Sequence, residues 1–172
     1  MKKLGIVEGF YGSLMSFSQR NSIVDSLSNN NLNFYLYAPK EDPFIRKHID
    51  LDHSKEWEEQ FQKFCRNANE QNVQISAGLC PKTYDYSSLA NKINKFKSLG
   101  CNHFAILFDD TDDYDFTSQL AIFNRAVNEF QDSEIIFCPS IYTSELIDQN
   151  DDSKEYFDNF KRDFPRDKTF IW

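Results

Sequence analysis

The feature that most constrains the fold of this chain is an alternation of short apolar runs with longer stretches of helical periodicity. The apolar runs begin about 29 to 40 residues apart, which is the length of one strand-plus-helix unit. Several of them, such as FYLYA, FAILF and IIFCP, are continuously apolar, as is typical of parallel strands covered on both faces. The expected strands cover residues 4–9, 33–39, 73–80, 103–110, 134–140 and 169–172.

Five amphipathic helices are expected between these strands. The first is weakly patterned and covers residues 18–30. The second is expected to follow an N-cap at Ser54, and the third to end before Gly100 in the C′ position. The last two are expected to follow N-caps at Thr117 and Ser153.

This order of elements predicts a parallel sheet, which is either an open doubly wound sheet or a (β/α)8 barrel. No G-x-G-x-x-G follows the first strand, so a dinucleotide-binding open sheet has no support. A barrel needs eight units and about 200 residues or more, whereas this chain has six expected strands and stops inside the sixth. We therefore expect an α/β fold of the (β/α)8 TIM-barrel type, incomplete here, with residues 1–172 forming a single fragment, the N-terminal three-quarters of a barrel.

Composition narrows the possible partners and location. The net charge is −8, which argues against nucleic acid or an anionic membrane as the main partner. No signal peptide and no apolar run of membrane-spanning length is visible, so a cytoplasmic location is expected. The four cysteines lack a C-x-x-C spacing and are expected to be buried thiols; they are Cys65, Cys80, Cys101 and Cys138.

Polar residues follow the expected strands at their carboxyl ends. In a parallel barrel these ends share one face, where active sites lie. The common location predicts a functional site there. The residues concerned are Glu8, Gly9, Lys40, Asp109, Asp110 and Tyr142.

The adjacent pair Asp109 and Asp110 closes an apolar run, so both carboxylates are expected to be partly desolvated. Neighbouring strand residues point to opposite faces, which suits one carboxylate that holds a substrate group and another that reaches the leaving oxygen. Two alternatives remain open, a strand-end aspartate that caps the following loop and a calcium loop. The calcium pattern lacks the glycine at its sixth position and the glutamate at its twelfth. The scattered histidines form no evident metal site, and no cofactor is expected.

Four motifs together resemble the catalytic domain of glycoside hydrolase family 84, which comprises O-GlcNAcases and bacterial β-N-acetylglucosaminidases. They are IVEGFYG at the first expected strand, YLYAPKEDP at the second, FAILFDDTD at the fourth and FCPSIY at the fifth. The resemblance runs in order from Gly5 to Trp172. It departs from the family's pattern at Ser13-Leu14-Met15 and at Pro81-Lys82, both in expected loops, which leaves the substrate range open.

The resemblance implies a retaining glycosidase that removes terminal β-linked N-acetylglucosamine by substrate-assisted catalysis. Asp109 would orient the 2-acetamido group, whose carbonyl oxygen attacks the anomeric carbon, and Asp110 would be the general acid and then the general base. Gly9, Lys40 and Tyr142 match positions that contact the sugar. The implied partner is a glycan or glycoprotein that contains N-acetylglucosamine, and the oligomeric state is left open. The alternative is a non-catalytic, truncated relative that binds sugar or a protein partner.

Overall fold

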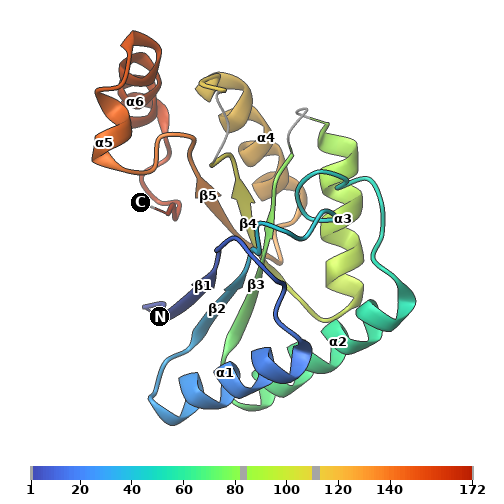
Figure 1. The fold of residues 1–172 in the computed structure, drawn as a ribbon. Helices are drawn as coiled ribbons and strands as arrows, with labels where there is room; N and C mark the ends of the chain where they lie inside the picture. The colour runs from blue at the N-terminus through green and yellow to red at the C-terminus, as the bar shows by residue number, and fades with distance from the viewer. Residues whose placement is uncertain (1, 82–84, 110–112, 172) are drawn as a thin grey trace.

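The computed structural model describes residues 2–81, 85–109 and 113–171, in which strands alternate with helices (Figure 1). The strands are β1 Gly5–Glu8, β2 Phe34–Tyr37, β3 Gln74–Leu79, β4 His103–Leu107 and β5 Glu134–Cys138. The helices are α1 Phe17–Asn29, α2 Lys55–Glu70, α3 Tyr86–Ser98, α4 Phe116–Glu129, α5 Ser144–Ile147 and α6 Asp151–Asp163.

The strands form one parallel sheet in the order β1-β2-β3-β4-β5, so each strand pairs with the next strand along the chain. A doubly wound sheet reverses its strand order at a switch point, and this sheet does not. Because successive right-handed crossovers run in one direction, α1 to α4 lie along the outer side of the sheet (Figure 1). The predicted parallel α/β fold is confirmed, and its winding is that of an arc of a barrel.

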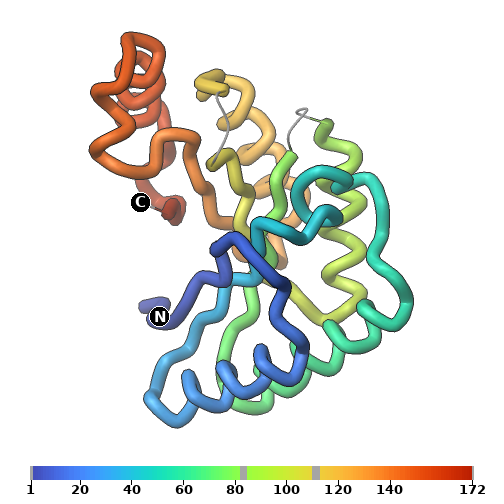
Figure 2. Tube along the Cα trace, in the orientation of Figure 1, coloured from blue at the N-terminus to red at the C-terminus, as the bar shows by residue number. Residues whose placement is uncertain are grey.

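The two faces of the sheet carry separate apolar clusters. On the outer face Tyr35 and Phe104 pack with the helices in a large core. On the inner face a smaller cluster contains Leu36 and Leu107. The path of the chain in Figure 2 brings both ends to this inner, open side, where Lys3 and Phe170 line one small cavity.

The sixth expected strand, residues 169–172, is present only as an isolated bridge. Phe170 pairs in parallel with Phe137 of β5. The amide of Phe137 donates to the carbonyl of Thr169 at 3.0 Å, and the amide of Ile171 donates to the carbonyl of Phe137 at 2.8 Å. The segment therefore continues the sheet beyond β5 in the expected parallel sense, while Trp172 lies outside the described residues.

Two predicted helix ends are confirmed. The Ser54 side chain accepts from the amide of Trp57 at the start of α2. Gly100 follows the C-cap of α3 with a φ of 89°, a left-handed conformation that favours glycine. Its amide donates to the carbonyl of Lys97, and the amide of Cys101 donates to that of Phe96, which completes a Schellman motif.

Two predicted N-caps are wrong. α4 is capped by Asp115 rather than Thr117, and α6 by Asn150 rather than Ser153. Ser153 instead occupies the third helical position, where its hydroxyl accepts from the amide of Asn150 in a capping box. The four-residue α5 was not expected, so six helices occur in the described ranges instead of five.

Two findings bear on the environment of the chain. All four cysteines are buried and free, as predicted. None of the helices in the described ranges combines the length and apolar character needed to cross a membrane.

Candidate active site

A cleft of about 360 Å³ lies on the inner side of the sheet at the carboxyl ends of its strands. It brings together Gly9, Lys40, Asp109 and Tyr142, four of the five predicted site residues that the structure describes. Asp110 lies outside the described residues. The full lining is Val7, Gly9, Tyr11, Leu36, Ala38, Lys40, Arg46, Leu107, Asp109, Cys138, Tyr142 and Ile171.

The polar centre of the cleft is the Asp109 carboxylate. Its Oδ2 atom lies 2.5 Å from Lys40 Nζ and 3.9 Å from a guanidinium nitrogen of Arg46. Its Oδ1 atom is buried and has no hydrogen-bond partner within the described part of the chain. One carboxylate oxygen thus faces two cations, while the other is buried with unused capacity to accept a hydrogen bond.

Backbone hydrogen bonds between two loops set Gly9 beside Lys40. The amide of Ala38 donates to the carbonyl of Glu8 at 3.2 Å, and the amide of Lys40 donates to that of Phe10 at 3.4 Å. These bonds extend the β1–β2 pairing beyond the strand ends. They place the residue after β1 and the residue three positions after β2 on the same side of the cleft.

Glu8, the other polar residue expected at this edge, does not face the cleft. It is completely buried on the helical side of the sheet, where Arg20 of α1 makes a bidentate ion pair with it at 2.9 and 3.0 Å. The Tyr35 hydroxyl also donates to it at 2.6 Å. Since side chains alternate along a strand, Gly9 and Glu8 point to opposite faces. Glu8 therefore joins α1 to the sheet and is not part of the site.

Arg46 is a cleft residue that the sequence analysis missed. It follows Lys40 by six residues, and one guanidinium nitrogen donates to the carbonyl of Ala38 at 3.4 Å. The side chain is buried beside Asp109, which leaves Arg46 Nε without a hydrogen-bond partner among the described residues. Its neighbours in the sequence, Ile45 and Lys47, show no pattern that marks it as a site residue.

A buried cluster around Asp42 supports the loop that carries Lys40, and the sequence analysis missed this cluster too. Asp42 accepts from the Tyr37 hydroxyl at 2.5 Å and from the Phe44 amide at 2.9 Å. His53 Nε2 lies 2.9 Å from the same carboxylate, and the His53 ring stacks on Trp57 at a centroid distance of 3.5 Å. Burial by itself would raise the pKa of Asp42, but the hydrogen bonds and charge of its partners hold that pKa below its usual value.

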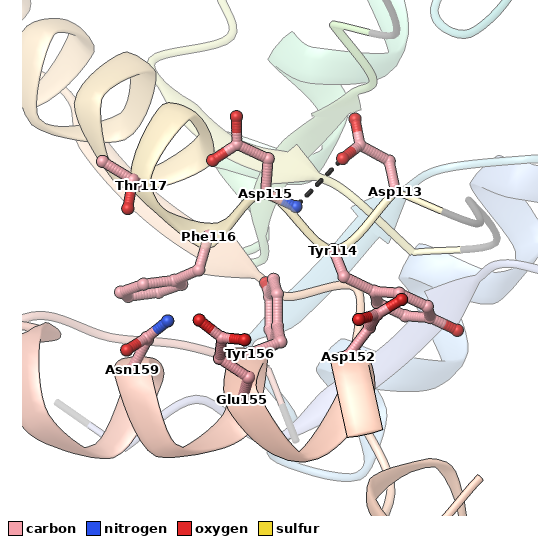
Figure 3. A pocket seen from close by; sticks show the side chains of 9 residues that line it. All are labelled: Asp113, Tyr114, Asp115, Phe116, Thr117, Asp152, Glu155, Tyr156 and Asn159. Carbon is pink, nitrogen blue, oxygen red and sulfur yellow. Dashed lines mark hydrogen bonds between the residues drawn. The ribbon is translucent and has the colours of Figure 1, made fainter. Parts of the chain in front are cut away.

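A second cleft, of about 550 Å³, lies between the start of α4 and α6 (Figure 3). Two of its acidic residues have structural roles, because Asp113 accepts from the amide of Asp115 at 3.0 Å and Asp115 caps α4 through Ser118. Among the residues that the structure describes, no group of three or more histidine, cysteine or acidic side chains is arranged to hold a metal ion. Asp115 thus caps a helix, whereas the capping and calcium alternatives for Asp109 and Asp110 concern a loop whose residues 110–112 lie outside the described residues.

Comparison with known proteins gives consistent results. A family model described as beta-N-acetylglucosaminidase matches residues 4–172. The Protein O-GlcNAcases of Rattus norvegicus and Mus musculus are each 31% identical to the chain over an alignment of 157 residues, which covers 80% of this chain. The chain spans 17% of the length of these curated relatives.

Solved structures agree on the fold. CpGH84B matches 99% of this chain with a TM-score of 0.89 and 25% identity, over 33% of its own length. A mutant of the Thermobaculum terrenum O-GlcNAc hydrolase matches 99% with a TM-score of 0.86 and 23% identity, over 41% of its own length. The sheet is thus an arc of the (β/α)8 barrel type. The chain belongs to the beta-N-acetylglucosaminidase family, glycoside hydrolase family 84, which its motifs resemble.

Proposed function

We propose that the protein removes terminal β-linked N-acetylglucosamine from a glycan or glycoprotein, with retention of configuration and by substrate-assisted catalysis. Membership of the family supports the class of reaction. The residues of the cleft support the way in which the sugar is bound.

The observation that carries this proposal is the state of Asp109. Its Oδ2 atom is paired with Lys40, and its buried Oδ1 atom has no partner within the described ranges. A buried acceptor without a donor costs free energy, and the N–H of a 2-acetamido group supplies that donor. The apolar floor made by Leu36 and Leu107 is suited to the methyl end of the same group.

In the proposed reaction, the acetamido carbonyl oxygen attacks the anomeric carbon as the bond to the leaving oxygen breaks. The bonding electron pair goes to the leaving oxygen, which takes a proton from Asp110, and an oxazoline-type intermediate forms. Water then attacks the anomeric carbon and loses a proton to Asp110. This attack opens the oxazoline ring and gives the product with net retention of configuration. Asp109 accepts a hydrogen bond from the acetamido N–H, while Gly9 and Tyr142 contact the sugar. The role of Asp110 rests on its place beside Asp109 and on the family motif.

The proposal is tested by hydrolysis of 4-nitrophenyl β-N-acetylglucosaminide by the full-length protein. Asp110→Asn and Asp109→Asn are each expected to lower kcat/KM by roughly 10²–10⁴-fold, since each removes one role in the transition state. The matched control is Asp115→Asn, because asparagine also caps helices well and this residue lies outside the cleft. NMR of the first product should show the β-anomer.

The competing non-catalytic role has its own signature. Saturable binding of N-acetylglucosamine without turnover, lost in Asp109→Asn, would identify a sugar-binding relative instead of an enzyme. Release of the α-anomer first would contradict the retaining mechanism. If the protein neither binds N-acetylglucosamine nor hydrolyses the glycoside, the proposed substrate class is overturned.

A further inference from the structure

Three buried residues form a closed ring of hydrogen bonds behind the cleft, in which one link is made by a backbone amide. Gln119 of α4 donates through Nε2 to Ser140 Oγ at 2.8 Å, and the Tyr156 hydroxyl of α6 donates to Gln119 Oε1 at 2.6 Å. The backbone amide of Ser140, two residues past β5, donates to the Tyr156 hydroxyl at 3.0 Å. All three residues are at most 3% exposed. Figure 3 shows Tyr156 projecting from α6 next to the residues that precede α4.

The ring also reaches two backbone carbonyls beside the cleft. Ser140 Oγ donates to the carbonyl of Phe108 at 2.9 Å, and Gln119 Nε2 donates to that of Asp113 at 3.2 Å. Phe108 directly precedes Asp109, and Ser140 lies two residues before Tyr142. The ring therefore holds the backbone at Phe108 and Asp113, on either side of Asp109, and at Ser140, before Tyr142.

The hydrogen-bond directions are mutually determined. In these bonds the Gln119 amide donates through Nε2 to two acceptors and accepts through Oε1, while the Ser140 and Tyr156 hydroxyls both donate and accept. Reversing the amide would set its oxygen against the Asp113 carbonyl. A buried polar network that is satisfied in only one arrangement specifies a single geometry, which an apolar core does not do.

We propose that Gln119, Ser140 and Tyr156 are positioning residues that fix Asp109 relative to Tyr142 in the sugar site. This inference rests on the proposed function, because it gives the ring a role in glycoside hydrolysis. Displacement of a reacting group by about 1 Å can cost 10²-fold in rate, so loss of an anchor behind Asp109 is expected to lower turnover.

The test uses Ser140→Ala and Tyr156→Phe in the full-length protein. Each is expected to lower kcat for an aryl N-acetylglucosaminide by about tenfold, with KM changed by less than about threefold. Because the ring acts as one unit, the double variant should be little worse than the worse single variant. Ser140→Thr keeps the hydroxyl and should recover most of the lost kcat.

The matched control is Tyr86→Phe, which removes the hydroxyl of another tyrosine with little exposed surface. That hydroxyl donates to Glu129 at 2.8 Å between α3 and α4, and Tyr86 does not line the cleft. A ring that only stabilises the fold would make Tyr156→Phe behave like Tyr86→Phe, with a lower thermal midpoint and unchanged kcat per folded molecule. That result would overturn the inference.

Hydrogen exchange tests the anchoring without relying on activity. In Ser140→Ala and Tyr156→Phe, the amides of Phe108 and Ser140 should exchange faster, while those of α2 should keep their wild-type rates. Unchanged exchange at both amides would overturn the inference even in an active enzyme. An inactive wild-type protein would overturn the proposed function. Faster exchange in the two variants than in that protein would still support anchoring of the two cleft segments.

Discussion

The Asp42 carboxylate lies where the β2 loop meets the start of α2, and its ionised form is the one that its surroundings favour. It is 2% exposed and receives the Tyr37 hydroxyl, the Phe44 amide and the His53 ring. Lys92, which donates to the carbonyl of Leu51 in the same loop, adds a nearby positive charge. These partners outweigh the cost of burying the charge, so the pKa of Asp42 is lowered on folding.

This lowered pKa predicts a specific pH dependence of stability. A carboxyl with a lower pKa in the folded state stabilises the fold above its unfolded pKa, and that contribution is lost as the pH falls through the folded pKa. Replacing Asp42 by Asn should cost about 1–3 kcal/mol in the free energy of unfolding near neutral pH. The gap to wild type should shrink as the pH is lowered from about 5 towards 2, as measured by urea unfolding at each pH. The control is Asp50→Asn, at an exposed carboxyl of the same loop, and a gap that is equal at pH 7 and pH 3 would contradict the prediction.

Some residues of the candidate site could be predicted from the sequence, and others could not. Lys40 and Asp109 follow apolar strands, and parallel pairing brings the ends of such strands together, so their meeting in one cleft could be predicted. Arg46 and His53 lie in the irregular segment between β2 and α2. Their contacts with Asp109 and Asp42 depend on how that segment folds back, which no periodic pattern encodes.

At the scale of elements, a glycine in β3 allows this strand to pack closely against its neighbours below the cleft. Gly78 faces the inner side, and a Cβ atom there would lie 2.7 Å from the Cβ of Ala38 and 2.8 Å from a methyl carbon of Leu107. Both neighbours line the floor of the cleft. The absence of a side chain at Gly78 therefore allows the strands on either side of β3 to close the floor.

Gly78→Ala should destabilise the fold by about 1–3 kcal/mol, because the Cβ of Ala38 moves only with its backbone. Ser76→Ala is the control, on the same strand and face. The Ser76 hydroxyl is buried without a hydrogen-bond partner in the part of the chain described, so its removal should be neutral or stabilising. The free energy of unfolding from urea titration measures both effects. Equal urea midpoints for Gly78→Ala and wild type would show that the residues around Gly78 accommodate a Cβ atom without loss of stability.

The elements themselves were predicted well where burial is periodic and less well at their ends. All five strands of the described sheet fall inside the expected apolar runs, although β1 is buried only in part. The ends of α4 and α6 were misassigned because each region offers several residues that can cap a helix. Asp115 and Thr117 differ by two positions, and the local fold of the preceding loop decides between them.

At the scale of the whole molecule, the helices cover only the outer face of the sheet, and the inner face stays partly open. Val7 of β1, which lines the cleft on this face, is 54% exposed. β1 is also an edge strand of the described sheet, whose unpaired backbone groups can pair with another chain. An apolar face next to an open edge favours association.

The polypeptide of residues 1–172, prepared by itself, is therefore expected to self-associate at micromolar concentrations. Val7→Lys places a charge on both the exposed face and the edge strand, and it should shift the distribution towards monomer in sedimentation velocity. Leu51→Lys is the matched control, because Leu51 is 51% exposed but lies in the loop before α2, away from this face. If both variants reduce association equally, general charge rather than the inner face explains the effect. A wild-type chain that stays monomeric throughout the concentration series would show that the open face and edge do not drive association.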